Sequence, residues 1–261
     1  MTLPIYQVDA FATEIFAGNP AAICPLEEWL PKEQMQKIAM ENNLAETAFF
    51  VKEENGYRLR WFTPVTEVQL CGHATLASAH VLFKHLGYEE ESIKFQTLSG
   101  PLTVRREGEQ LVMDFPASTC NVTEAPPLLE QALGVECNEV YSDMDHLCVL
   151  DTEQEVLNLT PNMRLLAQID GRGVIVTAPA DEEEADFVSR FFAPAVGVDE
   201  DPVTGSAHTM LTPYWSKVLG KNRLVGRQLS KRGGTVNCEL KGDRVILSGQ
   251  AKTYLKGEIT L

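Results

Sequence analysis

The feature that most constrains the fold is an internal repeat that spans most of the chain. Arg60–Pro64 reads RWFTP, and Arg190–Pro194 reads RFFAP 130 positions later. A glycine that opens a run of small residues follows in each half: Gly72 begins GHATLASAH, and Gly205 begins GSAHTML 133 positions later. A Thr-Val step after a glycine-containing turn then recurs at an offset of 132. Several features at one near-constant offset predict two copies of one folding unit.

Each copy combines short strands with two helical segments. Pro31–Met40 is helical in pattern and precedes the strand-like ETAFFV, while Pro161–Ala167 precedes GVIVTA. The segment after Gly72 is apolar on nearly all its faces, which predicts a helix enclosed by other elements, such as a curled sheet. In the second copy, we expect Pro213 to kink or end the corresponding helix.

Domain boundaries follow from a Pro-rich stretch between Pro116 and Pro127. The first repeat is predicted over residues 1–117 and the second over residues 118–253. Residues 254–261 form a last strand that completes the first repeat or packs on the second, and the sequence leaves this choice open.

The charge balance argues against several classes of function. The 261 residues include 37 acidic and 22 basic side chains, a formal net charge of −15. Nucleic acids and anionic membrane surfaces need a basic face, so neither is an expected partner. No run approaches the ~20 apolar residues of a membrane span. The N-terminus lacks the basic region of a signal peptide, which is typical of a cytoplasmic protein.

The cysteines and histidines form no recognisable motif. The cysteines are Cys24, Cys71, Cys120, Cys137, Cys148 and Cys238. Without a C-x-x-C spacing, they predict reduced, mostly buried thiols in the cytoplasm. His73, His80 and His85 are spaced poorly for metal binding, so we expect no metal site.

Both copies place a glycine and small polar residues at the N-terminus of a buried helix. Free N–H groups and the positive end of the helix dipole collect there and bind carboxylates or phosphates. Gly72 and Gly205 let a ligand approach the backbone because neither has a Cβ. Two such ends facing one another across an interdomain cleft would hold a small anionic substrate. The alternative is that both are ordinary capped helices.

Chemistry is expected where the two copies differ. The first copy has Ala45-Glu46-Thr47 at the strand after its early helix, where the second has roughly Arg172-Gly173-Val174. A glutamate that begins an apolar strand needs a partner or a task. Held against apolar walls, Glu46 would have a raised pKa suited to moving protons near neutral pH. The equal alternative is that Glu46 stays in water at the sheet edge.

Five ordered motifs carry a family resemblance: AGNP (Ala17–Pro20), NLAET (Asn43–Thr47), RWFTP, CGHATLASAH and EDPVTGSAH. Together they resemble the phenazine-biosynthesis isomerase (PhzF-like) family, which shares its fold with diaminopimelate epimerase. The resemblance runs over essentially the whole chain. It implies an α+β fold of two pseudo-symmetric domains, each a curled, mostly antiparallel β-sheet wrapped around a central α-helix. It also implies a homodimer, an active site between the domains and no cofactor.

The resemblance assigns roles to individual residues. Glu46 corresponds to the general acid/base that removes a ring proton and returns it at another carbon, with His73 and Asp201 as further catalytic residues. The implied substrate-binding residues are Gly72, Gly205, Ser206, Asn19 and Thr204. Cys71 lies where the epimerase relatives keep a catalytic thiol. The repeat places Thr204 opposite it, so a thiol pair is not expected, and Cys71 is interpreted as a relic or packing residue rather than a functional thiol.

The main hypothesis is therefore a cofactor-independent isomerase that moves a proton on a small cyclic or unsaturated carboxylic acid. The first alternative is a non-catalytic small-acid binding protein that retains the cleft, although a binder has no need of Glu46. The second is a thiol hydrolase built on Cys71 and His73. It is disfavoured because residues two apart at a helix start are expected to point in different directions, and nothing identifies an orienting acid.

Overall fold

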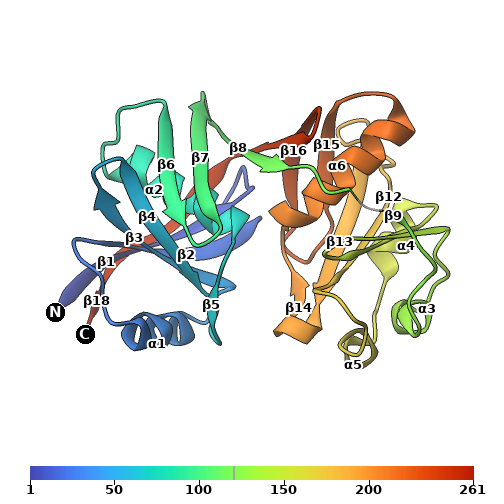
Figure 1. Cartoon of the computed structure of the whole chain (residues 1–261), viewed down its shortest axis with the longest axis horizontal. Helices are drawn as coiled ribbons and strands as arrows, with labels where there is room; N and C mark the ends of the chain where they lie inside the picture. Colours follow the sequence, from blue (N-terminus) through green and yellow to red (C-terminus); the bar gives the residue numbers. More distant parts are fainter. Residues whose placement is uncertain (120) are drawn as a thin grey trace. The chain divides into compact units, whose positions relative to one another are not determined.

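The computed structural model describes residues 1–119 and 121–261, so Cys120 lies outside the described residues. The chain divides into two compact units: unit 1 comprises Met1–Asp114 and Ser248–Leu261, and unit 2 comprises Phe115–Leu247 (Figure 1). Both chain ends belong to unit 1, where the amino group of Met1 donates to the carbonyl oxygen of Leu261 at 2.8 Å.

Unit 1 is built from a sheet and two helices. Its strands are β1 (Thr2–Ala10), β2 (Asn19–Leu26), β3 (Glu46–Glu53), β4 (Gly56–Phe62), β5 (Glu67–Val68), β6 (Ser92–Thr97), β7 (Gly100–Glu107), β8 (Gln110–Pro116) and β18 (Ala251–Thr260), and its helices are α1 (Lys32–Asn42) and α2 (Gly72–His85). Most neighbouring strands pair antiparallel, whereas β2–β3 and β4–β6 are parallel. The C-terminal strand β18 pairs with β1 along its whole length, which answers the question that the sequence left open.

Unit 2 repeats this order of strand pairing. Its strands are β9 (Asn121–Val122), β10 (Glu139–Ser142), β11 (His146–Val149), β12 (Val174–Pro179), β13 (Phe187–Ala193), β14 (Val198–Asp201), β15 (Arg223–Gln228), β16 (Gly234–Lys241) and β17 (Arg244–Gly249), and its helices are α3 (Leu129–Leu133), α4 (Glu153–Asn158), α5 (Met163–Leu166), the 3₁₀ turn η1 (Pro194–Val196) and α6 (Gly205–Leu219). The parallel pairs β11–β12 and β13–β15 correspond to β2–β3 and β4–β6 of unit 1. The antiparallel pairs between them also correspond, which matches the sequence repeat.

The enclosed helix predicted after Gly72 is confirmed. Every residue of α2 from His73 to Leu82 is buried, and the helix contacts β1, β2, β3, β7 and β18. Small residues make this packing possible: Ala74, Ala77 and Ala79 have no exposed surface, and the Ser78 hydroxyl donates back to the carbonyl of Ala74 at 2.7 Å. Helix α1 packs differently, with Met35 and Ile38 in a cluster that includes Phe49 and Phe62 on the sheet.

Two predictions about helices in unit 2 are corrected. Helix α6 does not end at Pro213 but continues to Leu219. Tertiary packing holds this second half in place: Trp215 stacks on Phe187 with ring centroids 5.8 Å apart, and its Nε1 donates to Thr177 Oγ1 at 2.9 Å. Such burial outweighs the hydrogen bond that proline removes. Helix α5 is shorter than the predicted Pro161–Ala167, since it covers only Met163–Leu166.

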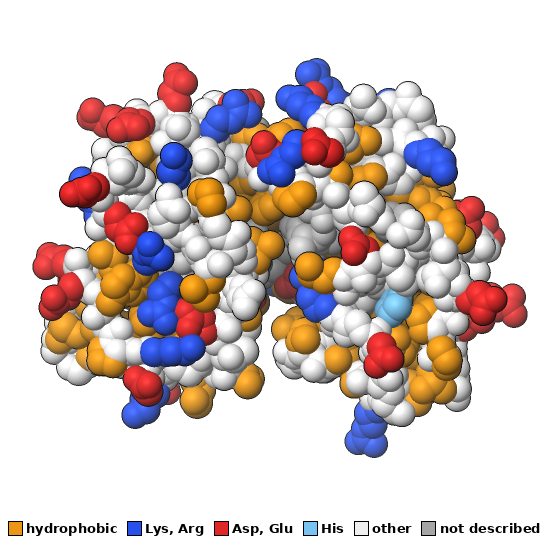
Figure 2. All heavy atoms as spheres, in the orientation of Figure 1, with side chains coloured by type: hydrophobic (Ala, Val, Ile, Leu, Met, Phe, Trp, Pro, Cys, Tyr) orange, Lys and Arg blue, Asp and Glu red, His pale blue; other side chains and the backbone are white. Residues whose placement is uncertain are grey.

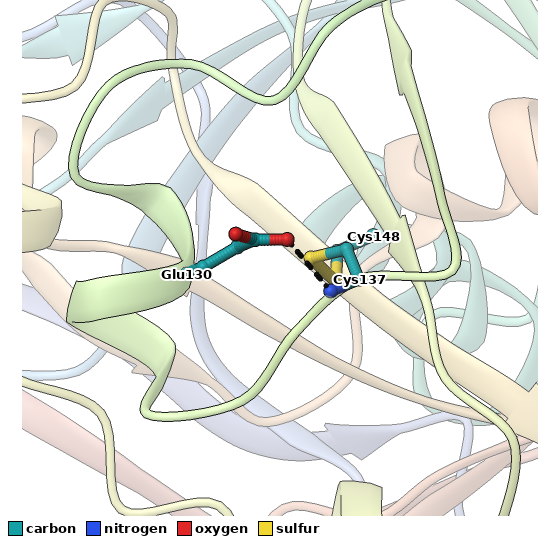
Figure 3. Close-up of a disulfide and its surroundings, with 3 residues drawn as sticks. All are labelled: Glu130, Cys137 and Cys148. Carbon is teal, nitrogen blue, oxygen red and sulfur yellow. Dashed lines mark hydrogen bonds between the residues drawn. A yellow bond between two sulfur atoms is a disulfide. The ribbon is translucent and has the colours of Figure 1, made fainter.

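The expectation that all cysteines are reduced is wrong. Cys137 and Cys148 form a disulfide, beside which Glu130 Oε1 accepts a hydrogen bond from the backbone N–H of Cys137 at 3.0 Å (Figure 3). Cys24, Cys71 and Cys238 are free and buried, as predicted. The cysteine argument for a cytoplasmic location is therefore weakened, since disulfides are rare in that compartment.

The surface carries charged side chains of both signs (Figure 2). Acidic and basic side chains are interspersed over the face that Figure 2 shows. Among the described residues, no helix is long and apolar enough to cross a membrane.

Candidate active site

Glu46 is placed by the turn between α1 and β3. Asn43 ends α1 in the left-handed conformation (φ 49°, ψ 36°), which asparagine tolerates well, and its N–H donates to the carbonyl of Ala39. Strand β3 begins three residues later with Glu46, which lies opposite Ala21 of β2. The Glu46 side chain is only 16% exposed. The alternative that Glu46 stays in water is therefore wrong.

Cys71 and His73 meet Glu46 at the start of α2. Cys71 is the N-cap residue of the helix, and His73 is its second helical residue. The Sγ atom of Cys71 lies 3.5 Å from Nδ1 of His73, and Nε2 of His73 lies 3.1 Å from Oε2 of Glu46. The His73 side chain is 6% exposed. The structure thus brings together two predicted catalytic residues and a thiol that sequence reasoning had set aside.

Burial and neighbouring charges shift the pKa values of the Cys71 thiol and the His73 imidazole. Burial raises the pKa of the Cys71 thiol, and the negative charge of Glu46 raises it further. Burial lowers the pKa of His73, but the charges that Cys71 and Glu46 carry when ionised outweigh it and raise that pKa well above its usual value. With the thiol protonated, the Glu46 carboxylate is the remaining charge that raises the pKa of His73.

Both sequence objections to a thiol hydrolase are wrong. Cys71 and His73 are in contact, and Glu46 occupies the place of an orienting acid. The raised pKa of the Cys71 thiol still argues against this chemistry, because the thiolate is the nucleophile that it needs.

The second copy has no equivalent of Glu46. Thr47 pairs with Phe62 in unit 1, and Val174 pairs with Phe192 in unit 2, so Gly173 corresponds to Glu46. A Cβ on Gly173 would lie 2.6 Å from a ring carbon of a neighbouring phenylalanine and 2.8 Å from a backbone oxygen. Unit 2 therefore has no room for a carboxylate side chain at this position.

Asp201 and Thr204 form a closed turn before α6. The Thr204 hydroxyl donates to Asp201 Oδ2 at 2.5 Å, and Thr204 is buried as the N-cap residue of the helix. Gln228 on β15 holds the same turn: its Oε1 accepts from the Thr204 N–H at 2.8 Å, and its Nε2 donates to the carbonyl of Asp201 at 2.7 Å. Thr204 thus stabilises the turn, and its hydroxyl holds the Asp201 carboxylate in one orientation.

The other predicted binding residues lie near these two groups in the chain. Gly72 opens α2, Gly205 opens α6, and Ser206 is half-buried beside Gly205. Asn19 is fully buried at the start of β2, two residues before the partner of Glu46. The preceding Gly18 has φ +68° and no space for a Cβ, which explains the glycine of AGNP. Glu46, His73, Gly72 and Asn19 belong to unit 1, and the remaining predicted residues belong to unit 2.

Sequence reasoning missed two partly buried ion pairs and Gln228. Arg60 binds Glu67 through two hydrogen bonds, and Arg190 binds Glu200 in the same way. Both arginines come from the repeated RWFTP and RFFAP segments. An acidic residue follows each segment in the sequence, and this repetition could have predicted the two ion pairs. The contact of Gln228 with the Asp201–Thr204 turn could not be predicted from a local sequence pattern, because Gln228 lies 24 residues from Thr204.

His73, His80 and His85, which were considered as metal ligands, do not lie together as a group of three. His80 and His85 both lie within hydrogen-bond distance of Thr253 Oγ1, whereas His73 contacts Cys71 and Glu46. In the described part of the chain, the group that could offer three metal ligands is Glu46, Cys71 and His73, whose ligand atoms all lie within 4.8 Å of one another.

Comparison with known proteins supports these observations. The phenazine biosynthesis-like protein family, PhzC-PhzF, matches residues 8–257. An uncharacterized isomerase of Pseudomonas aeruginosa is 51% identical over 261 residues, which cover all of both chains. A solved PhzF-family phenazine biosynthesis protein from Enterococcus faecalis is 50% identical with a TM-score of 0.97, again over all of both chains. A predicted epimerase from Pseudomonas aeruginosa, 19% identical over 99% of each chain, shares the fold with a TM-score of 0.78. The predicted diaminopimelate epimerase-like fold is confirmed, and the chain belongs to the phenazine biosynthesis-like (PhzC-PhzF) family, as an isomerase.

Proposed function

We propose that this isomerase moves a proton on a small cyclic or unsaturated carboxylic acid without a cofactor, with Glu46 as the general acid/base. The observation that carries the proposal is the mostly buried Glu46 carboxylate beside the His73 imidazole. The ionised carboxylate takes a proton from one carbon of the substrate and returns it at another. His73 Nε2, 3.1 Å from Glu46 Oε2, orients the carboxylate.

One carboxylate, rather than two, supports removal and return of the proton by the same residue. Gly173 occupies the position equivalent to Glu46, and the second copy of Cys71 is Thr204, whose hydroxyl is committed to Asp201. A two-base reaction would need an acid/base group from each copy. Of the two repeats, only the first therefore supplies a carboxylate at this position to carry the proton, which is Glu46.

The N-terminus of α2 is a proposed anion-binding group of unit 1, and the N-terminus of α6 is a proposed anion-binding group of unit 2. Among the described residues, neither Cys71 nor Thr204 caps its own helix with a side-chain hydrogen bond. The N–H groups at the first turn of a helix are favourable contacts for an anion. Gly72, Gly205 and Ser206 would contribute these contacts. Asp201 and Asn19 would orient the polar groups of the substrate.

We also propose that the protein is a homodimer, as the family resemblance implies, and that it is cytoplasmic, as the lack of a basic N-terminal region suggests. Light scattering at micromolar concentration tests the dimer, since a monomeric mass would contradict it.

The function is tested by deuterium uptake from D₂O into a panel of small carboxylic acids that includes dihydro-3-hydroxyanthranilate. The wild type is compared with Glu46→Gln and with the control Glu53→Gln, which changes a carboxylate at the far end of the same strand. We expect the wild type and the control to incorporate deuterium into at least one acid, and Glu46→Gln to lose this activity.

Two outcomes would contradict the proposal. Full exchange by Glu46→Gln would remove Glu46 as the proton carrier. Binding of these acids, seen as shifted NMR signals, with neither deuterium exchange nor a changed product in the presence of the wild type would favour the small-acid binding protein instead.

A further inference from the structure

Cys71 and Glu46 contact opposite nitrogens of the His73 ring. Sγ of Cys71 is 3.5 Å from Nδ1, while Oε2 of Glu46 is 3.1 Å from Nε2. The three side chains therefore form a linear chain of contacts in which the imidazole is the middle member. In this arrangement the thiol is placed to act on the Glu46 carboxylate only through His73.

The contacts fix where the ring must carry a proton. An ionised carboxylate only accepts hydrogen bonds, so Nε2, the nitrogen that faces Glu46, has to donate. Burial raises the pKa of the Cys71 thiol, so the sulfur keeps its proton near neutral pH. The thiol donates to Nδ1 when the ring is neutral, and its sulfur accepts from Nδ1 when the ring is an imidazolium. Both forms leave the N–H of Nε2 directed at the carboxylate.

A buried imidazole that is held by one nitrogen alone is poorly fixed in orientation. Rotation about the last side-chain torsion of histidine is broad and roughly two-fold, and a half-turn exchanges the ring edges. The His73 side chain is only 6% exposed, so water compensates little for an Nδ1 atom without a partner. A sulfur beside Nδ1 therefore favours the one ring orientation in which Nε2 faces Glu46.

The backbone of Cys71 is held by contacts that do not involve its sulfur. Its carbonyl oxygen accepts from the N–H of Thr75 at 3.2 Å and from the Thr75 hydroxyl at 2.6 Å. Thr75 has no exposed surface, and Cys71 is buried as well. The sulfur thus approaches His73 from a fixed point, and a substitution of Cys71 removes the thiol while these backbone contacts remain.

The second repeat uses the residue at the same helix position in a similar way. Thr204 is the N-cap residue of α6, as Cys71 is of α2, and its hydroxyl donates to Asp201 Oδ2 at 2.5 Å. Neither N-cap side chain forms a capping hydrogen bond to its own helix in the described chain. In each repeat, this side chain instead contacts a polar side chain that the sequence assigned to the site.

We propose that Cys71 is a positioning residue of the isomerase: its hydrogen bond with Nδ1 of His73 holds the imidazole so that Nε2 donates to Glu46. The carboxylate is then presented to the substrate in one orientation. No covalent bond is made or broken at the sulfur. The hydrogen bond stands independently of the reaction, whereas its effect on the rate rests on the proposed function of Glu46.

The test compares Cys71→Ala and Cys71→Ser with the wild type by ¹⁵N NMR of the histidine side chains, recorded as a pH series. Because the shift of a ring nitrogen depends on its proton and its hydrogen-bond partner, we expect the Nδ1 signal of His73 to move in Cys71→Ala. Cys71→Ser retains a donor and should stay nearer the wild type. Circular dichroism confirms that each variant is folded.

The second measurement is the rate of deuterium exchange into the panel of acids that includes dihydro-3-hydroxyanthranilate. A misplacement of about 1 Å can cost ~10²-fold in rate, so kcat should fall by roughly 10–100-fold in Cys71→Ala, with little change in KM. Cys71→Ser should recover part of this loss. The control Cys24→Ala removes a buried free thiol from a separate core cluster and should exchange like the wild type.

Each outcome decides a separate point. Ring-nitrogen signals of His73 that are the same in Cys71→Ala and the wild type would overturn the hydrogen bond. Altered signals with an unchanged kcat in Cys71→Ala would overturn the positioning role. Full exchange by Glu46→Gln would defeat the proposed function, and with it the effect on rate, while the NMR signals of His73 would still decide the hydrogen bond.

Discussion

His208 gives the sharpest test of how the core of unit 2 is built. The residue is fully buried in α6, and its Nδ1 lies 2.8 Å from the carbonyl oxygen of Thr204, so Nδ1 carries the proton and donates. Nε2 has no hydrogen-bond partner among the described residues, and a Cβ on Gly226 would lie 3.0 Å from it. Burial lowers the pKa of His208 to about 4. The folded protein therefore needs this imidazole to be neutral.

The magnitude follows from proton linkage. An unfolded chain binds a proton at this histidine near pH 6.5, whereas the folded chain does so only near pH 4. Stability from neutral His208 is thus complete above pH 6.5 and is lost as the pH falls toward 4. The full loss is about 3 kcal/mol, of which about 2 kcal/mol has gone by pH 5.

The perturbation is His208→Gln, whose amide can donate to the Thr204 carbonyl without a titrating group. Urea unfolding is followed by tryptophan fluorescence at pH 7.5 and pH 5, since Trp215 lies in the same helix. His80, whose pKa burial also lowers to about 4, adds a similar loss to both proteins. We expect the wild type to lose about 2 kcal/mol more than the variant between the two pH values. An equal loss in both would refute the argument.

Two further predictions concern packing and cross-linking in unit 2. Gly173→Ala should lower the free energy of unfolding by about 1–3 kcal/mol through overpacking, because its Cβ would meet a ring at 2.6 Å. Gly257→Ala, whose nearest neighbour is 3.6 Å away, is the control, and equal stability of the two variants would contradict the argument. Cys137→Ser should cost about 3 kcal/mol, because Cys137 and Cys148 are 11 residues apart and the disulfide restricts the unfolded chain. Dithiothreitol should reproduce this loss in the wild type but not in the variant, and an unchanged urea midpoint in both would contradict it.

Much of the fold could be predicted because the same order of strands and helices is indicated independently by each copy of the repeat. The apolar faces of α2 predicted an enclosed helix, and residues 74–82 are buried accordingly. The continuation of α6 past Pro213 could not be predicted, because the stacking of Trp215 on Phe187 is a tertiary contact without a local signal. Likewise, nothing in the cysteine spacing indicated that Cys137 and Cys148 would meet.

The site was predicted in part. Glu46 and His73 emerged from the repeat and the family resemblance, and the structure places them 3.1 Å apart. The contact of Cys71 with His73 was not predicted, since it depends on the side-chain rotamers at the start of α2. The role of Gln228 depends on how β15 packs beside the Asp201 turn, which local sequence patterns do not encode.

The central claim is that Glu46 carries the proton. The most direct measurement is NMR in D₂O of dihydro-3-hydroxyanthranilate with the wild type and with Glu46→Gln. General acid–base catalysis contributes ~10²–10⁴-fold to rate, so the account predicts conversion by the wild type and a loss of that size in Glu46→Gln, with ligand signals still shifted by binding. Conversion by both proteins at the same rate would contradict it.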